Sequence, residues 1–151
     1  ALSGRIGAGV LLVGHVCEGL FLFGAAALTV KTLVNTRPLT FDSIFGAICG
    51  YLFLGVSWAV FYSLIEGLQP GSFKISETLA ANSGSSSLTP HLLTYYSFIT
   101  LATVGYGDIT PISSTACTLS WMEAITGQFY LAVIVAGLVS MLLSRSQPTD
   151  R

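Results

Sequence analysis

Charged residues are scarce in this sequence: six Lys or Arg and seven Asp or Glu make up 9% of 151 residues. A soluble domain usually carries about 25%, so the composition excludes an ordinary soluble domain and favours a chain that lies in a lipid bilayer. The net charge of −1 offers no basic surface, and we expect no nucleic-acid partner. Cysteine is also scarce, and the three present lie in separate apolar runs, which favours free thiols over a disulfide framework.

Three further absences narrow the function. No apolar run carries the row of arginines that a voltage sensor requires. No nucleophile–base pair or zinc-ligand spacing is present, so we expect neither an enzyme nor a resident cofactor. The early glycines, Gly4, Gly7 and Gly9, do not form a dinucleotide-binding motif.

Long apolar runs are abundant, since 52% of the residues are hydrophobic. Ile44–Ile65 is uncharged and, as a helix, would extend roughly 33 Å, enough to cross a bilayer core. Cys117–Leu143 contains a single charged residue, Glu123, and Ile6–Val30 contains two polar interruptions. We therefore predict an all-α membrane protein with three transmembrane helices.

The segment between the second and third runs has a different character. Gln69–Leu88 is polar and rich in Ser and Gly, which predicts a water-exposed loop. Thr89 suits a helix N-cap, and Pro90 suits the first helical position. Residues 90–102 are too few to span a bilayer. We predict a re-entrant half-helix whose negative dipole end abuts Thr103.

The next six residues, 103–108, read TVGYGD. Irregular backbone at membrane depth is tolerated only when it is buried in protein or lines an aqueous path. Backbone carbonyls in a short run of this kind can replace the water shell of a potassium ion, and glycine permits the backbone geometry. The residues therefore predict a potassium selectivity filter directly after the half-helix.

The run from Tyr95 to Asp108, YYSFITLATVGYGD, resembles the pore signature of potassium channels. The order of outer helix, pore helix, filter and inner helix matches as well, and the resemblance covers Ile44–Leu143. It implies a homotetramer, because one filter strand cannot surround an ion. The predicted domains are an additional transmembrane helix in 1–36, a pore domain in 40–145 and a cytoplasmic tail in 146–151. Within the pore domain we expect outer helix 44–66, turret loop 67–89, pore helix 90–102, filter 103–108 and inner helix 115–143.

Carried over residue by residue, the resemblance assigns K+ coordination to the carbonyls of Thr103, Val104, Gly105 and Tyr106. The Thr103 hydroxyl would form the innermost oxygen ring, and Gly105 and Gly107 would adopt backbone angles that a Cβ disfavours. The Tyr106 side chain would point away from the ion and brace the filter. Related nonselective channels often differ at this tyrosine, so Tyr106 favours potassium selectivity.

Support for the filter is expected from five residues: Tyr95, Tyr96, Thr100, Asp108 and Glu123. Asp108 would bond to an aromatic residue of the pore helix. This chain has two tyrosines where many relatives have paired tryptophans, and a phenol can donate a hydrogen bond to a carboxylate.

Where some relatives carry a glutamate behind the filter, this chain has Ile99. An acidic residue inside a membrane is costly and usually marks a site. Glu123 would then lie behind the filter, bonded to the pore helix or the filter, and replace the missing support. The alternative is a shallow position near the outer interface, beside Trp121.

The same alignment places Gly127 at the hinge of the inner helix, and close helix packing is an equally open role for it. Gln128, Leu131 and Val135 follow at helical spacing and would face a water-filled cavity.

Two weaker patterns lie on the first two runs. Gly46 and Gly50 form a GxxxG pattern, for which helix packing is the favoured interpretation. His15 and Glu18 share a helix face. They would form either a pH-sensitive pair or, as we favour, a mutually satisfied polar pair that joins helices.

Basic residues indicate the orientation, because cytoplasmic loops carry an excess of Lys and Arg. Lys31 and Arg37 lie between the first two runs, and Arg145 and Arg151 follow the third. We predict a multi-pass protein of the cell membrane, with the pore mouth outside and the C-terminus in the cytoplasm. A cleaved signal peptide is disfavoured, because polar residues interrupt the first run and cleavage would reverse this orientation.

These features together predict passive, potassium-selective conduction, with K+, the lipid bilayer and identical copies of the chain as partners. Two alternatives stay open: a nonselective cation channel, and a non-conducting membrane subunit or scaffold that retains the pore fold. A potassium transporter usually joins four filter repeats in one chain, and this sequence carries one.

Overall fold

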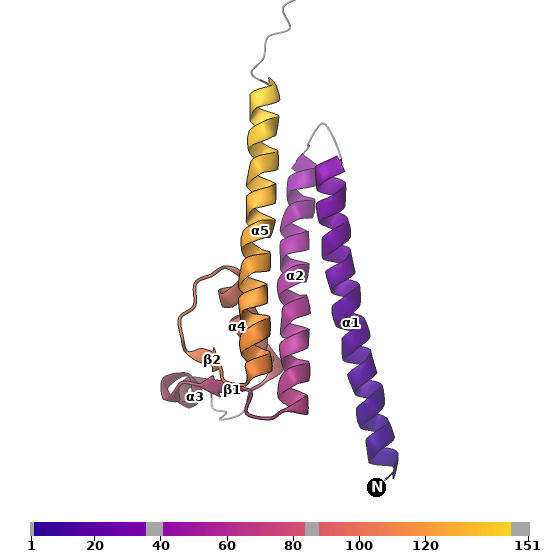
Figure 1. The fold of residues 1–151 in the computed structure, drawn as a ribbon, viewed down its shortest axis with the longest axis vertical. Helices are drawn as coiled ribbons and strands as arrows, with labels where there is room; N and C mark the ends of the chain where they lie inside the picture. Colours follow the sequence, from indigo (N-terminus) through magenta and orange to yellow (C-terminus); the bar gives the residue numbers. More distant parts are fainter. Residues whose placement is uncertain (1, 36–40, 84–87, 146–151) are drawn as a thin grey trace, which may run out of the picture.

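The computed structural model describes residues 2–35, 41–83 and 88–145. Three long helices lie side by side in it (Figure 1): α1 (Leu2–Asn35), α2 (Phe41–Leu68) and α5 (Ser114–Arg145). The helix α1 packs along α2, and α2 also contacts α5. The short helix α4 (Pro90–Leu101) packs against both α2 and α5.

Two of the long helices have the length and composition of membrane spans. These are Ile44–Leu68 within α2 and Ser114–Gly137 within α5. Both expose large apolar side chains: Phe45 is 66% exposed and Phe129 is 69% exposed. Surfaces of this kind need lipid or another chain against them. The described part of α1 contributes a shorter apolar stretch, so the third transmembrane helix stays a prediction.

The half-helix α4 begins at Pro90, as the sequence predicts. The Thr89 hydroxyl accepts a hydrogen bond from the backbone N–H of Leu92 at 3.4 Å and so caps the first turn. The helix ends at Leu101, with Ala102 as its C-cap. One face of α4 is buried and carries Leu92, Leu93, Tyr96, Ser97, Ile99 and Leu101.

The segment predicted as an exposed loop contains two regular elements that sequence reasoning missed. The strand β1 (Phe73–Ile75) pairs antiparallel with β2 (Ile109–Pro111), and the short helix α3 (Glu77–Ser83) follows β1. The side chains of Phe73 and Ile109 are buried. This pairing ties the turret to the residues directly after TVGYGD. Figure 1 shows these elements at the end of the helices opposite to the C-terminal end of α5.

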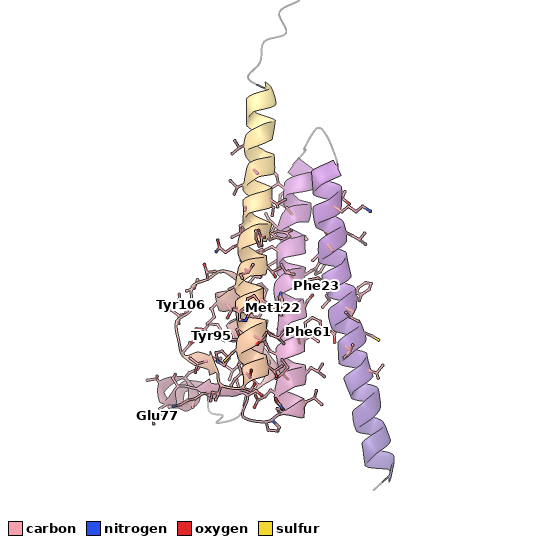
Figure 2. The ribbon with its side chains drawn as sticks, in the orientation of Figure 1. Phe23, Phe61, Glu77, Tyr95, Tyr106 and Met122 are labelled. Atoms are coloured by element: carbon pink, nitrogen blue, oxygen red, sulfur yellow. The ribbon has the colours of Figure 1, made fainter. Side chains whose placement is uncertain are left out.

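Small residues allow α1 and α2 to approach each other. A Cβ at Gly19 of α1 would come within 3.2 Å of the Phe61 ring of α2, and Figure 2 shows Phe61 between these helices. A Cβ at Gly50 would meet the Thr29 side chain of α1 at 3.1 Å and the Tyr130 hydroxyl of α5 at 2.5 Å. Gly50 therefore serves helix packing, as its GxxxG pattern predicts.

The polar pair predicted on the first run is described only in part. Glu18 is exposed on α1, whereas the His15 side chain lies outside what the structure describes, so a bond between them stays a prediction. The three cysteines are free thiols on three different helices, and each is exposed on the single chain: Cys17, Cys49 and Cys117.

Candidate functional site

The residues of the predicted filter form an irregular loop that leaves the end of α4 and bows away from α5 (Figure 1). The backbone angle φ is positive at every second residue: +56° at Thr103, +55° at Gly105 and +77° at Gly107. The two glycines adopt the geometry that their residue type predicts. Thr103 was not expected to do so, because a β-branched residue rarely enters the left-handed region.

The backbone N–H groups of the loop turn back towards the end of α4. Val104 and Gly105 both donate to the carbonyl of Ile99, at 2.8 and 3.3 Å. Thr103 donates to the carbonyl of Thr100 at 2.9 Å. The last carbonyls of a helix have no hydrogen-bond donor within the helix. These bonds therefore satisfy both the carbonyls at the end of α4 and the N–H groups of the loop.

This arrangement orients the carbonyls of the loop. N–H and C=O point in opposite directions across a planar trans peptide. The carbonyls of Thr103 and Val104 share peptide planes with the N–H groups of Val104 and Gly105, and they therefore point away from α4. Two successive backbone oxygens of the loop therefore lie on one side, opposite to α4.

The side chains of the loop lack cover in the single chain. Tyr106 is 72% exposed and Val104 is 50% exposed. Figure 2 shows Tyr106 out on the loop, apart from the packed helices. The brace predicted for Tyr106 is therefore not provided by its own chain.

A hydrogen bond anchors the Asp108 end of the loop to α4. The Tyr95 hydroxyl donates to Asp108 Oδ2 at 2.6 Å, which is the kind of contact predicted for Asp108. This bond to the carboxylate raises the pKa of Tyr95 to about 12, so the phenol stays a neutral donor. Asp108 Oδ1 accepts from the N–H of Ile109 at 3.0 Å, and its carbonyl accepts from the N–H of Ser76 at 2.8 Å.

Glu123 lies on the other side of α4, in a cluster that is closed to solvent. Its side chain is 0% exposed, so within the chain it lacks the water access that a shallow interfacial position beside Trp121 requires. The Tyr62 hydroxyl of α2 lies 2.5 Å from Oε2, and the Ser97 hydroxyl of α4 lies 2.5 Å from Oε1. Sequence reasoning expected the pore-helix contact but named neither partner. The only signal in the sequence was that both are polar residues within apolar stretches.

Tyr96 belongs to the same buried face. Its hydroxyl lies 2.7 Å from Ser120 Oγ of α5, and its ring packs edge-on against Tyr62 and Phe73, with centroids 5.2 and 5.3 Å apart. The two adjacent tyrosines therefore bond in different places. Tyr95 reaches the Asp108 end of the loop, whereas Tyr96 fastens α4 to α5.

The helix α5 touches the loop at its beginning. A Cβ at Gly127 would collide with the backbone carbonyl of Leu101, so this glycine lets the end of α4 rest on α5. The contact supports the packing role of Gly127, and a hinge there stays a prediction. The Gln128 amide donates to Thr103 Oγ1 at 3.1 Å. Leu131 and Val135 are exposed on the single chain, at 41% and 56%.

Comparison with known proteins identifies the class to which this architecture belongs. The model of a family described as "Ion channel" matches residues 43–144, from α2 through the loop to α5. The chain belongs to this ion channel family. The match begins after α1 and does not include this helix.

Three relatives show how far the similarity extends. Protein LctB of Bacillus caldotenax is 33% identical over 124 residues, covering 82% of this chain and 90% of LctB. The inward rectifier potassium channel Kirbac3.1 of Paramagnetospirillum magnetotacticum is 38% identical over 85 residues, or 53% of this chain and 29% of its own length. Two pore potassium channel c of Oryza sativa subsp. japonica is 30% identical over 107 residues, or 71% of this chain and 20% of its own length. No solved structure matches the chain.

Proposed function

We propose that the chain is one of four identical subunits of a potassium-selective channel. The observation that carries this proposal is the backbone of residues 103–107, with positive φ at alternate residues and N–H groups bonded back to α4. A row of carbonyls held in this way can replace the hydration shell of K+. The oxygens would belong to Thr103, Val104, Gly105 and Tyr106, with the Thr103 hydroxyl at the inner end.

The exposed side chains of the loop support assembly around an axis. One loop presents carbonyls to an ion from one direction only, and a ring of oxygens needs further copies. Val104 and Tyr106 are exposed in the single chain, and neighbouring subunits would cover them. The apolar exposed face of α5 would likewise pack against neighbouring subunits or lipid.

Conduction would follow from these parts. An entering ion would exchange its water for successive carbonyl rings, and repulsion between adjacent ions would keep each site from holding its ion too tightly. The C-terminal ends of four α4 helices would direct their negative dipole ends towards the inner mouth, where a cation is favoured. Leu131 and Val135 would line the cavity below.

Selectivity for potassium rests on Tyr106 and on the relatives. Two of the relatives carry the name of potassium channels, although this chain covers less than a third of either one. The tyrosine in the filter favours K+ over a nonselective pore. A nonselective cation channel and a non-conducting subunit with the same fold are the alternatives that the experiment below must separate.

We further propose that α1 is a third transmembrane helix on the periphery of the pore domain. Its 34 residues would extend roughly 50 Å as a helix, more than a bilayer core. Figure 1 shows the C-terminal end of α1 and the C-terminal end of α5 at one end, and the filter loop towards the other. Lys31 lies in the last turns of α1, which supports a cytoplasmic location for this end and an outer location for the filter mouth.

The proposal is tested with purified protein in liposomes. Potassium flux that sodium does not support, and that barium blocks, is the expected result. Equal flux of Na+ and K+ would instead assign a nonselective channel. A verified tetramer without flux would favour the scaffold, and a monomer that persists in bilayer cross-linking would contradict the assembly.

A further inference from the structure

The buried cluster behind α4 has fewer hydrogens than acceptors if Glu123 is ionised. The Ser97 hydroxyl lies 2.7 Å from the carbonyl of Gly55 and 2.5 Å from Glu123 Oε1. A serine hydroxyl carries one hydrogen and can donate to one of these oxygens. The Tyr62 hydroxyl also carries one hydrogen, which it donates to Oε2. An ionised Glu123 would therefore leave two oxygens in close contact without a hydrogen between them.

A protonated Glu123 satisfies every atom of the cluster. The acid O–H at Oε1 donates to Ser97 Oγ, the Ser97 hydroxyl donates to the Gly55 carbonyl, and the Tyr62 hydroxyl donates to Oε2. The Gly55 contact is held firmly, because a Cβ at Gly55 would collide with the Phe98 ring of α4. None of the side chains that the structure describes forms an ion pair with Glu123, and an unpaired buried charge is costly.

We infer that Glu123 is a neutral carboxylic acid, and that its proton fastens the pore helix α4 to α2 and α5 and so positions the selectivity filter. The inference rests on the proposed channel function for its effect on flux. Glu123 acts as a positioning residue, since it does not touch the filter itself. Loss of its proton to water would leave the cluster without the hydrogen that joins Glu123 Oε1 to Ser97 Oγ.

The route from Glu123 to the filter is short. Ser97 lies two residues before Ile99 in α4, and the Ile99 carbonyl holds the N–H groups of Val104 and Gly105. If Ser97 loses one of its two partners, this turn of α4 is held less firmly on its buried side, where the Tyr96–Ser120 bond is retained. The carbonyls of Thr103 and Val104 would then lose their common orientation.

Other groups near Glu123 titrate at higher pH and provide an internal control. Tyr62 and Tyr51 of α2 and Tyr96 of α4 are the ionisable groups that interact with it electrostatically. Tyr96 itself lies against Ser120 of α5, which does not titrate. All three are phenols, whose ordinary pKa is about 10. A variant that removes only the acid retains them all.

The matched variant is Glu123→Gln. Its amide N–H can donate to Ser97 Oγ and its amide oxygen can accept from Tyr62, which reproduces the pattern of the neutral acid. Flux at neutral pH should stay within about twofold of the wild type. As pH rises, wild-type flux should fall by about tenfold per pH unit once the acid ionises, while Glu123→Gln stays level until the phenols titrate. Glu123→Ala should lose flux at every pH.

Infrared spectroscopy tests the protonation state without any need for conduction. The spectrum of the wild type minus that of Glu123→Gln, at neutral pH, should contain the C=O stretch of a protonated carboxylic acid. A carboxylate band in its place would overturn the inference, as would identical flux profiles of the two proteins through alkaline pH. Absence of flux in the wild type would reject the proposed function, while the infrared band would still decide the state of Glu123.

Discussion

The two sides of α4 are built in opposite ways. The side that faces α2 and α5 is closed to solvent and joined by side-chain bonds from Tyr62, Tyr96 and Ser97. The side that carries the filter loop is open, held by backbone bonds, and exposes Tyr106. The closed side is complete within one chain, whereas the open side needs other copies. Changes on the two sides should therefore produce different defects.

The largest effect is expected from Gly105→Ala on the open side. A Cβ at φ +55° costs about 1–2 kcal/mol per residue, and the same strain would recur in every subunit of the tetramer. We expect loss of potassium flux with tetramers still present. The matched control is Gly71→Ala, whose φ is +86° in the turn before β1 and whose Cβ would meet nothing within 4 Å. Equal loss of flux in both variants would contradict the role of the 103–107 backbone.

Gly127→Ala should have the next largest effect, on stability. Its Cβ would collide with the Leu101 carbonyl, and overpacking of this kind costs about 1–3 kcal/mol. A lower melting temperature in detergent is expected. Gly24→Ala serves as control, because nothing lies within 4 Å of a Cβ there. If both variants melt like the wild type, α4 does not rest on α5 as described.

The adjacent tyrosines give a direct comparison of the two sides. Tyr95→Phe removes the bond to Asp108, worth about 1.5 kcal/mol, and should lower the preference for K+ over Na+. Tyr96→Phe removes the bond to Ser120, worth about 1 kcal/mol, and should lower the melting temperature with little change in selectivity. Ion competition and thermal unfolding measure the two outcomes. If Tyr96→Phe lowered selectivity and Tyr95→Phe did not, the closed side of α4, rather than the open side, would control selectivity.

The smallest effect is expected from Glu66→Gln, near the C-terminal end of α2. The Glu66 carboxylate accepts from the N–H groups of Gly71 and Ser72, at 2.8 and 3.0 Å, in the turn that leads to β1. Glutamine offers one oxygen in place of two. Because the turn is largely exposed, we expect a loss below about 1 kcal/mol in stability and unchanged selectivity. A change in selectivity would show that the β1–β2 pairing acts on the filter more directly than its contacts indicate.

Sequence reasoning succeeded where the signal is local. The apolar length of α2 and α5, the start of α4 at Thr89–Pro90, and the left-handed glycines Gly105 and Gly107 all follow from residue type and neighbours. It failed where the signal is spread along the chain. The strands β1 and β2 are three residues each and pair across the whole pore segment, and neither shows a pattern long enough to read.

The sequence by itself determined which segments are apolar, where a half-helix begins, and which six residues carry the predicted filter motif. Each of these depends on hydrophobicity, capping and backbone freedom within a few residues. Only the tertiary structure decided the partners of Glu123, since Ser97 and Tyr62 lie 26 and 61 residues away from it. It likewise decided that Gly127 meets Leu101 and that Tyr95 and Tyr96 bond on different sides. Contacts of this kind depend on how three helices pack together, and that packing is set by many weak contacts at once rather than by any one stretch of residues.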